Sequence, residues 1–242
     1  MKVIDLNADL GEGIAWESEL LPLISSANIC CAAYAGSPEI TRATVESCLA
    51  LGIRIGAHPG YPDPANFGRS PFQSLNLTLQ QLNENLKSQL ALIPEATYIK
   101  PHGAFYNETS TKNPPTIPPP RGGEGEGHPE ITTCLLALLK ATKLPFMGLA
   151  QNSPHISTAM AAQVPFIREG FIDRRYGPNH RLLPRSNPDA IIHDHQEAID
   201  QALRLATTCD SLCVHGDNPN APELLAKIRK ALEDDGYTIK AK

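Results

Sequence analysis

The chain has 242 residues, of which 41% are hydrophobic and 19% charged, and its formal net charge is -5 at neutral pH. This mildly acidic balance, without any run of Lys and Arg, disfavours nucleic acid as the main partner. No apolar stretch reaches the ~18 residues of a membrane span, and the N-terminus lacks the basic-then-apolar layout of a signal peptide, so we expect a cytoplasmic protein without membrane contact.

The length and the cysteines fit one intracellular domain. A chain of this length is typical of a single α/β barrel, so we expect one domain over residues 1–242. The six cysteines lie inside apolar segments, and no C-x-x-C pair occurs. We therefore expect reduced, buried thiols rather than disulfides or a zinc site.

Short β-rich runs alternate with helical patterns along the chain. Leucines recur at helical spacing over Leu75–Ile93, and Pro38 precedes a second helix over Glu39–Leu51 that Gly52 ends. The predicted strands are Val3–Leu6, Asn28–Ala32, Ile53–Ala57, Thr97–Lys100, Pro145–Leu149, Pro165–Glu169 and Ser211–His215. This alternation predicts parallel strands, arranged either as a (β/α) barrel or as a doubly wound sheet. The lack of Gly-x-Gly-x-x-Gly after the first strand favours the barrel.

One segment, from about residue 108 to residue 130, breaks this alternation. It is rich in proline and then alternates Gly with Glu in "GGEGEG". Such a composition cannot bury enough apolar surface to offset its ordering entropy, so we expect a flexible insert. A lid or a partner-docking strip is the alternative interpretation.

Polar residues follow every predicted strand at the same end. In parallel barrels and open α/β sheets, ligands gather where the strands end and the loops begin. The residues at these positions are Asp5, Asn7, Asp9, Glu12, Tyr34, His58, Lys100, His102, Gln151, Asn152, Glu169, Asp173, Arg174, Arg185, His215 and Asp217. We expect them to converge on one pocket.

Three histidines share one local pattern, in which an apolar strand is followed by His beside Pro or Gly. His58, His102 and His215 fit three interpretations. With Asp5 and Asp9 they could hold a divalent metal, although no H-x-x-x-H or H-E-x-x-H pair occurs. They could instead position loops, or act directly as acids and bases.

Five motifs in order resemble the LamB/YcsF lactam-utilisation family. They are "DLNADLGEG", "LISSANICCAAYAGSPEITRATVESCLALGIRIGAHPGYPDPANFGR", "YIKPHGAFYNE", "EGFIDRRYGPNHRLLPRS" and "CVHGDNPNA". The resemblance covers the chain except the Pro/Gly-rich insert. It implies a distorted seven-stranded (β/α) barrel of the glycoside hydrolase/deacetylase type. It also implies the activity of the A subunit of a bacterial-type 5-oxoprolinase, which opens the lactam of 5-oxo-L-proline to L-glutamate with ATP hydrolysis.

The resemblance further implies partners and residue roles. The B and C subunits of 5-oxoprolinase, separate chains, would bind ATP and activate the lactam, which agrees with the lack of a P-loop here. Asp9 or Asp5 would be the base, Lys100 would stabilise the oxyanion, and His58, His102 and His215 would be acid/base or ligand groups. Substrate contacts would come from Asn7, Glu12, Tyr34, Glu169, Asp173, Arg174, Arg185 and Asp217.

The chain departs from the family pattern after the second strand. Typical members read Gly-Phe-His-Ala-Gly-Asp-Pro, whereas here Tyr34 replaces the histidine and Ser37 the aspartate. Tyrosine is a poor base at neutral pH, because its pKa is near ~10. Two other functions are therefore kept open: metal-dependent hydrolysis or deacetylation of another small amide, and non-catalytic binding of a lactam or a partner. A homo-oligomer is one alternative for the assembly.

Overall fold

Parallel strands alternate with helices in the computed structural model, which describes residues 2–111, 129–151, 153–177, 180–185, 187–216 and 218–241. The strands are β1 (Lys2–Leu10), β2 (Ser26–Cys30), β3 (Arg54–His58), β4 (Phe146–Leu149), β5 (Phe166–Phe171), β6 (Ser211–Val214) and β7 (Tyr237–Ile239). The α-helices are α1 (Glu17–Leu20), α2 (Pro38–Leu51), α3 (Leu79–Ala91), α4 (Gly103–Thr109), α5 (Pro129–Thr142), α6 (Pro154–Ala162), α7 (His195–Leu205) and α8 (Ala221–Asp234). Short 3-10 turns are η1 (Leu21–Leu23), η2 (Pro64–Asn66) and η3 (Phe72–Ser74).

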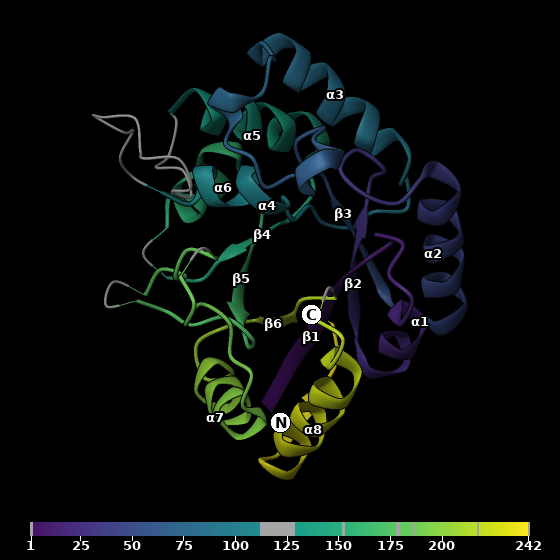
Figure 1. Ribbon diagram of the computed structural model, residues 1–242, viewed down its shortest axis with the longest axis vertical. Coiled ribbons are helices and arrows are strands. Elements are labelled where there is room, and N and C mark those ends of the chain that lie inside the picture. Colours follow the sequence, from purple (N-terminus) through teal and green to yellow (C-terminus); the bar gives the residue numbers. More distant parts are fainter. Residues whose placement is uncertain are drawn as a thin grey trace.

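The sheet closes into a ring through Ile99. The strands lie in the order β3-β2-β1-β6-β5-β4, and β7 pairs with β1 outside this path. Ile99 forms parallel bridges with Ala57 at one edge and with Phe146 at the other. Lys100 N donates to Ala57 O at 3.0 Å, and Met147 N donates to Ile99 O at 2.9 Å. The predicted barrel is confirmed, with the helices around its outside (Figure 1). The barrel is distorted at this point, because the single residue Ile99 takes the place of a full strand between β3 and β4.

Several predicted boundaries shift for local physical reasons. The predicted strand at 97–100 is reduced to the bridged Ile99, because Pro101 has no N–H with which to continue the pairing. Helix α3 begins only after Thr78, which forms a capping box with Gln81, so Leu75 lies outside the helix. β7 was not predicted, since three residues carry little periodic signal.

The ends of the predicted insert belong to helices. Glu108 and Thr109 complete α4, and α5 starts at Pro129. The part of the insert from 112 to 128 lies outside the described residues.

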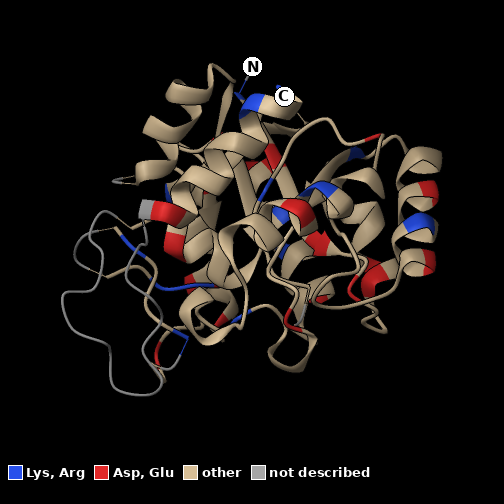
Figure 2. Cartoon of the chain, turned by 90° about the horizontal axis from the view of Figure 1, so that it is seen from above, with Lys and Arg blue, Asp and Glu red and all other residues tan. Residues whose placement is uncertain are grey.

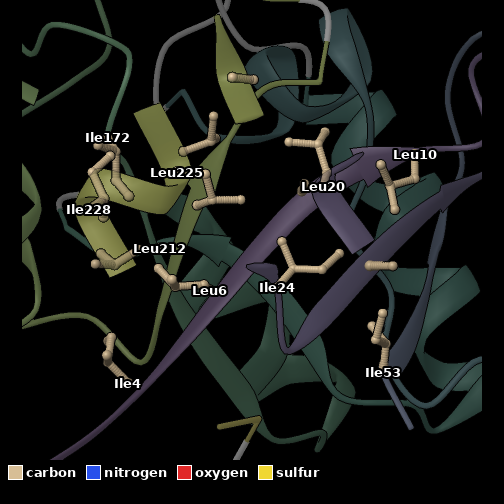
Figure 3. Packing of buried hydrophobic residues seen from close by; sticks show 14 of the residues in the cluster. Ile4, Leu6, Leu10, Leu20, Ile24, Ile53, Ile172, Leu212, Leu225 and Ile228 are labelled. Atoms are coloured by element: carbon tan, nitrogen blue, oxygen red, sulfur yellow. The ribbon is translucent and has the colours of Figure 1, made fainter. Parts of the chain in front are cut away.

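The alternation of β1 explains why so many polar residues are buried in one strand. Ile4, Leu6, Ala8 and Leu10 are fully buried and belong to the cluster that packs between the sheet and the helices. Figure 3 shows Leu6 and Leu212 of the sheet opposite Leu225 and Ile228 of α8. Because successive side chains point to opposite faces, the residues between them must point into the barrel.

The interior of the barrel is filled by a hydrogen-bonded polar network. Both carboxylate oxygens of Asp5 accept from serine hydroxyls, those of Ser25, Ser26 and Ser211. Burial raises the pKa of Asp5, and these hydroxyls oppose the rise. Nearby, Asn28 Nδ2 donates to Asn7 Oδ1 at 2.7 Å. Such a network is stable because its buried polar atoms find partners.

Further expectations from the sequence concern the cysteines, membrane-spanning segments and the charges on the helices. All six cysteines are free and buried, as expected. Among the described residues, no helix is both long and apolar enough to span a membrane. In the view of Figure 2, acidic and basic positions are interspersed along the helices.

Close packing inside the barrel gives a stability prediction. A methyl group added to Gly56 would lie 2.2 Å from Cζ of Tyr98, whose hydroxyl donates to Asn28 Oδ1 at 2.7 Å. We expect Gly56→Ala to lower the free energy of unfolding by about 3 kcal/mol, because the ring cannot move without breaking this bond. In the control Gly52→Ala, φ is +67° and the added methyl meets no described atom within 4 Å, so only backbone strain of about 1 kcal/mol applies. Urea denaturation measures both, and equal losses would contradict the steric explanation.

Candidate functional site

A pocket opens at the carboxyl ends of the strands, with about 660 Å³ of empty space including open solvent at its mouth. Its wall combines charged groups with a few apolar side chains. The lining residues are Asp9, His58, Arg69, Pro71, Lys100, Pro101, His102, Gly103, Ala104, Tyr106, Asn107, Phe171, Arg174, Leu182, Arg185 and His215. The location is the one expected for parallel strands.

The ammonium group of Lys100 is the centre of the charged cluster. It is 2% exposed and lies 2.8 Å from Asp9 Oδ1 and 2.8 Å from Glu169 Oε1. It also lies 3.2 Å from Cys213 Sγ. Burial alone would lower the pKa of Lys100, but Asp9, Cys213 and Glu169 raise it well above its usual value. Burial alone would likewise raise the pKa of Asp9, but His58 and Lys100 hold it well below its usual value. Lys100 and Asp9 are therefore both charged at neutral pH.

Two buried imidazoles face each other beside Asp9. His58 Nδ1 lies 2.7 Å from the carbonyl oxygen of Lys100, and His102 Nε2 lies 2.9 Å from that of Phe67. Because a carbonyl oxygen only accepts, each of these nitrogens is assigned the hydrogen. The other two nitrogens, His58 Nε2 and His102 Nδ1, lie 3.0 Å apart. Burial and the neighbouring His58 lower the pKa of His102 well below its usual value, so it is neutral.

The same three side chains form a group that could hold a metal ion. One ligand atom from each of Asp9, His58 and His102 lies within 4.8 Å of the others, and all three residues are buried. His58 Nε2 is 3.3 Å from Asp9 Oδ2. A histidine that binds a metal usually donates its second ring N–H to a carbonyl or carboxylate, which both imidazoles do here.

His215 is oriented separately by Asp173. Asp173 Oδ1 lies 2.9 Å from His215 Nδ1, and its Oδ2 accepts from the His215 backbone N–H at 3.0 Å. Burial opposes ionisation of Asp173, but His215 lowers the pKa of this carboxyl. The ring of His215 stacks on Phe171, with centroids 5.4 Å apart. This arrangement leaves Nε2 as the nitrogen available to a ligand in the pocket.

Arginines and apolar side chains complete the wall. Arg174 and Arg185, both predicted from the loop after β5, line the pocket together with Arg69 from the loop after η2. Arg174 also donates to the carbonyl of Leu183 at 2.6 Å, which fixes its direction. Guanidinium groups at a pocket rim suit a carboxylate or a phosphate.

The other predicted residues take positions around this pocket. Asp5 and Asn7 lie within the interior network rather than in the pocket lining. Glu12 is buried, with Oε1 3.7 Å from His102 Nδ1. Glu169 accepts from Tyr106 OH at 3.0 Å and pairs with Lys100. Gln151 does not line this pocket, and Asn152 and Asp217 lie outside the described residues.

Tyr34 lies behind His102 rather than in the pocket lining. Its ring stacks on the imidazole, with centroids 3.7 Å apart and planes inclined by 8°, and its hydroxyl donates to the carbonyl of His58 at 3.3 Å. Gly60 makes room for it, since a Cβ there would lie 2.7 Å from the ring. Tyr34 therefore supports both histidines from behind.

Several site residues were not predicted from the sequence. Asn28 was placed in a strand, but its contact with Asp9, at 2.8 Å, depends on the pairing of β1 with β2. Arg69 ends the motif "PANFGR", where no sequence feature marks it as a site residue, and Tyr106 follows the "KPHGAF" turn on α4. The period-two pattern Ser26, Asn28 was the available signal for an inward polar face.

A family model and two named relatives match this chain over most of its length. The model of the LamB/YcsF family matches residues 4–116 and 126–242. A Neisseria meningitidis protein, named as the A subunit of 5-oxoprolinase, is 38% identical over 263 residues, covering 100% of both chains. A Pseudomonas aeruginosa protein, also named as an A subunit of 5-oxoprolinase, is 34% identical, covering 94% of this chain and 96% of its own.

Solved structures support the same assignment of fold. The lactam utilization protein of Thermus thermophilus superposes with a TM-score of 0.81 at 29% identity, covering 99% of this chain and 100% of its own. A family 4 carbohydrate esterase of Streptomyces lividans has a TM-score of 0.53 at 11% identity, covering 98% and 91%. The esterase shows a likeness of fold alone.

The charge cluster predicts the effect of removing its lysine. Lys100→Met leaves Asp9 and Glu169 buried without this cation, so we expect the free energy of unfolding to fall by about 3–5 kcal/mol at about pH 7. Without the ammonium, burial of Asp9 is less well opposed, and the folded-state pKa of Asp9 rises. The loss should therefore shrink as the pH falls toward about 5, because the folded variant binds protons there. Chemical denaturation at both pH values measures this, with the exposed Lys87→Met as control. A loss that grows on acidification would contradict it.

Proposed function

This chain belongs to the LamB/YcsF family, and on that basis we propose that it opens the lactam ring of 5-oxo-L-proline by hydrolysis to give L-glutamate. Separate partner chains, the B and C subunits, would hydrolyse ATP and activate the lactam. The relatives named as A subunits of 5-oxoprolinase support this activity, and the word subunit in their names supports the partners.

The observation that carries the proposal is the convergence of an ionised carboxylate, a buried lysine and three histidines on one small pocket. A lactam is a stabilised amide, so its hydrolysis needs an oriented water, a cation near the developing oxyanion and a proton for the leaving nitrogen. Each of these needs has a candidate group here. The arginines at the rim suit the substrate carboxylate.

We assign the steps to residues of this chain. Asp9 accepts a hydrogen bond from the attacking water and orients it. Because its pKa is held low, Asp9 is too weak a base to take the proton of this water. His215, fixed by Asp173, takes the proton from the water as its oxygen adds to the lactam carbonyl carbon. Lys100 stabilises the resulting oxyanion. When the ring C–N bond breaks, His215 returns the proton to the nitrogen, which becomes the amino group of glutamate.

Turnover measurements test this assignment. We expect 5-oxoproline-dependent glutamate release from the purified chain with the B and C subunits and ATP, and little release when either is omitted. Asp9→Asn should reduce kcat at least about 100-fold, because the amide cannot orient water as the carboxylate does. The exposed Asp234→Asn on α8 is the control. Unchanged turnover in Asp9→Asn would remove that residue from the mechanism, and no glutamate under any condition would reject the proposed reaction.

A second candidate function is favoured by the Asp9–His58–His102 group: metal-dependent hydrolysis or deacetylation of a small amide. The donor set fits a divalent transition metal, because a carboxylate oxygen and one nitrogen of each imidazole lie close together, while the second nitrogen of each ring faces a backbone carbonyl. When bound, such an ion would supply Lewis acidity near the substrate carbonyl. Lys100 would then serve chiefly to hold Asp9 in place.

Metal content separates this candidate from the metal-free one. If the group binds an ion, elemental analysis after dialysis against Zn²⁺ should find about one equivalent per chain, and chelation should lower Tm. His102→Ala should lose most of that metal, whereas the exposed His193→Ala should keep it. Equal metal content in His102→Ala and the native chain, or none in either, would count against a metal site here.

A further inference from the structure

Arginines from two separate loops line the pocket at the carboxyl ends of the strands. Arg69 lies over the ring of Phe67, with its Cζ 4.9 Å from the ring centroid, and the Phe67 ring is 5.7 Å from that of His102. Arg174 and Arg185 come instead from the loop that follows β5. Which of these guanidinium groups meets the substrate decides which lactams the site accepts.

The loop after β5 also carries the group that orients the proton-transferring histidine. Asp173 Oδ1 lies 2.9 Å from His215 Nδ1, and the ring of His215 stacks on Phe171 at the end of β5. Arg185 acts on the same carboxyl, because burial opposes the ionisation of Asp173, whereas His215 and Arg185 lower its pKa. Arg185 and the imidazole of His215 are therefore neighbours in the pocket wall.

The two arginines of this loop differ in their roles. Arg174 is 4% exposed and donates to the carbonyl of Leu183 at 2.6 Å. Leu183 N in turn donates to the carbonyl of Arg175 at 2.9 Å, so both backbone polar groups of this leucine are bonded within the loop. Pro184 follows with its fixed φ, and Arg185 comes next, half-buried in the pocket wall. Arg174 thus holds the segment in place, and Arg185 presents its side chain to the pocket.

The covalent structure of the lactam connects these positions. In the proposed mechanism His215 returns a proton to the lactam nitrogen, so this nitrogen must approach Nε2 of His215. In 5-oxo-L-proline the carbon on the far side of the nitrogen from the carbonyl carries the carboxylate. With the carbonyl oxygen at Lys100 and the nitrogen at His215, the carboxylate lies two bonds beyond the nitrogen, where Arg185 stands in the wall.

We propose that Arg185 binds the substrate carboxylate and makes the site selective for lactams that carry a carboxylate on the carbon next to the ring nitrogen. The carboxylate position rests on the proposed function, in which the lactam nitrogen faces His215. A guanidinium and a carboxylate pair through two parallel N–H···O bonds, which fix the orientation of the ring as well as binding it. A neutral lactam lacks this pairing, and so does one whose carboxylate is one carbon further round the ring. The same contact therefore selects the substrate and directs its nitrogen toward the imidazole.

Binding to the full chain without partners tests the residue directly. Ligand-observed NMR titration gives Kd for 5-oxo-L-proline, for 2-pyrrolidinone, which has no carboxylate, and for 5-oxopyrrolidine-3-carboxylate, whose carboxylate is one carbon further from the nitrogen. The native chain should prefer 5-oxo-L-proline to both by about tenfold or more, and Arg185→Met should remove most of this preference by raising its Kd alone. Arg185→Lys, which keeps the charge without the planar fork, should retain part of the selectivity and carries the test if Arg185→Met fails to fold. Arg204→Met, exposed on α7, is the matched control and should change no Kd.

Several outcomes would overturn the assignment to Arg185. They are native binding that does not depend on the carboxylate, no binding by the native chain, an equal loss for all three lactams in a folded Arg185→Met, and a loss of selectivity in Arg69→Met instead.

Glutamate release by the complex with the B and C subunits and ATP is measured in parallel. Arg185→Met should raise KM for 5-oxo-L-proline more than it lowers kcat, because the carboxylate is bound before and during the reaction. Carboxylate-dependent binding that is lost in Arg185→Met, without any glutamate release by the native complex, would reject the proposed reaction while supporting this contact.

Discussion

The burial of one ammonium group organises the centre of this protein. Lys100 follows Ile99, the residue that closes the ring of strands, and its side chain reaches Asp9 on β1 and Glu169 on β5. A charge at 2% exposure is tolerated only with close counter-charges. Its own carbonyl then holds His58 at 2.7 Å. Closure of the barrel and assembly of the charged cluster are therefore one structural event rather than two.

This constraint explains why the barrel interior is polar. A ring with a charged lysine pointing inward needs acceptors on the inward face of β1, and the strict alternation of that strand supplies Asp5, Asn7 and Asp9 there. Asn28 links Asn7 to Asp9 through its amide nitrogen, at 2.7 and 2.8 Å. The network below the pocket thus fixes the rotamer of the carboxylate in it. The sequence pattern alone would place Asp5 and Asn7 in the pocket. They lie below it instead, in the network that holds the pocket side chains in position.

The sequence predicted the alternation of strands and helices, the closed parallel arrangement and the end of the barrel that carries the site, because these follow from periodicity and from the general behaviour of parallel sheets. It did not separate pocket residues from supporting ones. Tyr34 and Asp5 looked like site residues, but the register that places Tyr34 behind His102 and Asp5 among serines is a tertiary property. Arg69 shows the reverse case, since an arginine after a Phe-Gly turn carries no local signal of a pocket wall.

A cluster this well balanced raises the question of how its state could be changed from outside. Asp9 and Lys100 hold their charges firmly, since each shifts the pKa of the other in the direction of ionisation. A change of pH within the physiological range therefore has little effect on the charges of this pair. Displacing one of the charged groups would change the cluster more. Glu169 is the member of the cluster that borders a second opening, and its Tyr106 contact ties it to α4. A small shift of this carboxylate would weaken one of the two ion pairs that hold the ammonium group. The position of Glu169, which is fully buried and held by Tyr106 of α4, therefore decides how firmly the ammonium group is held.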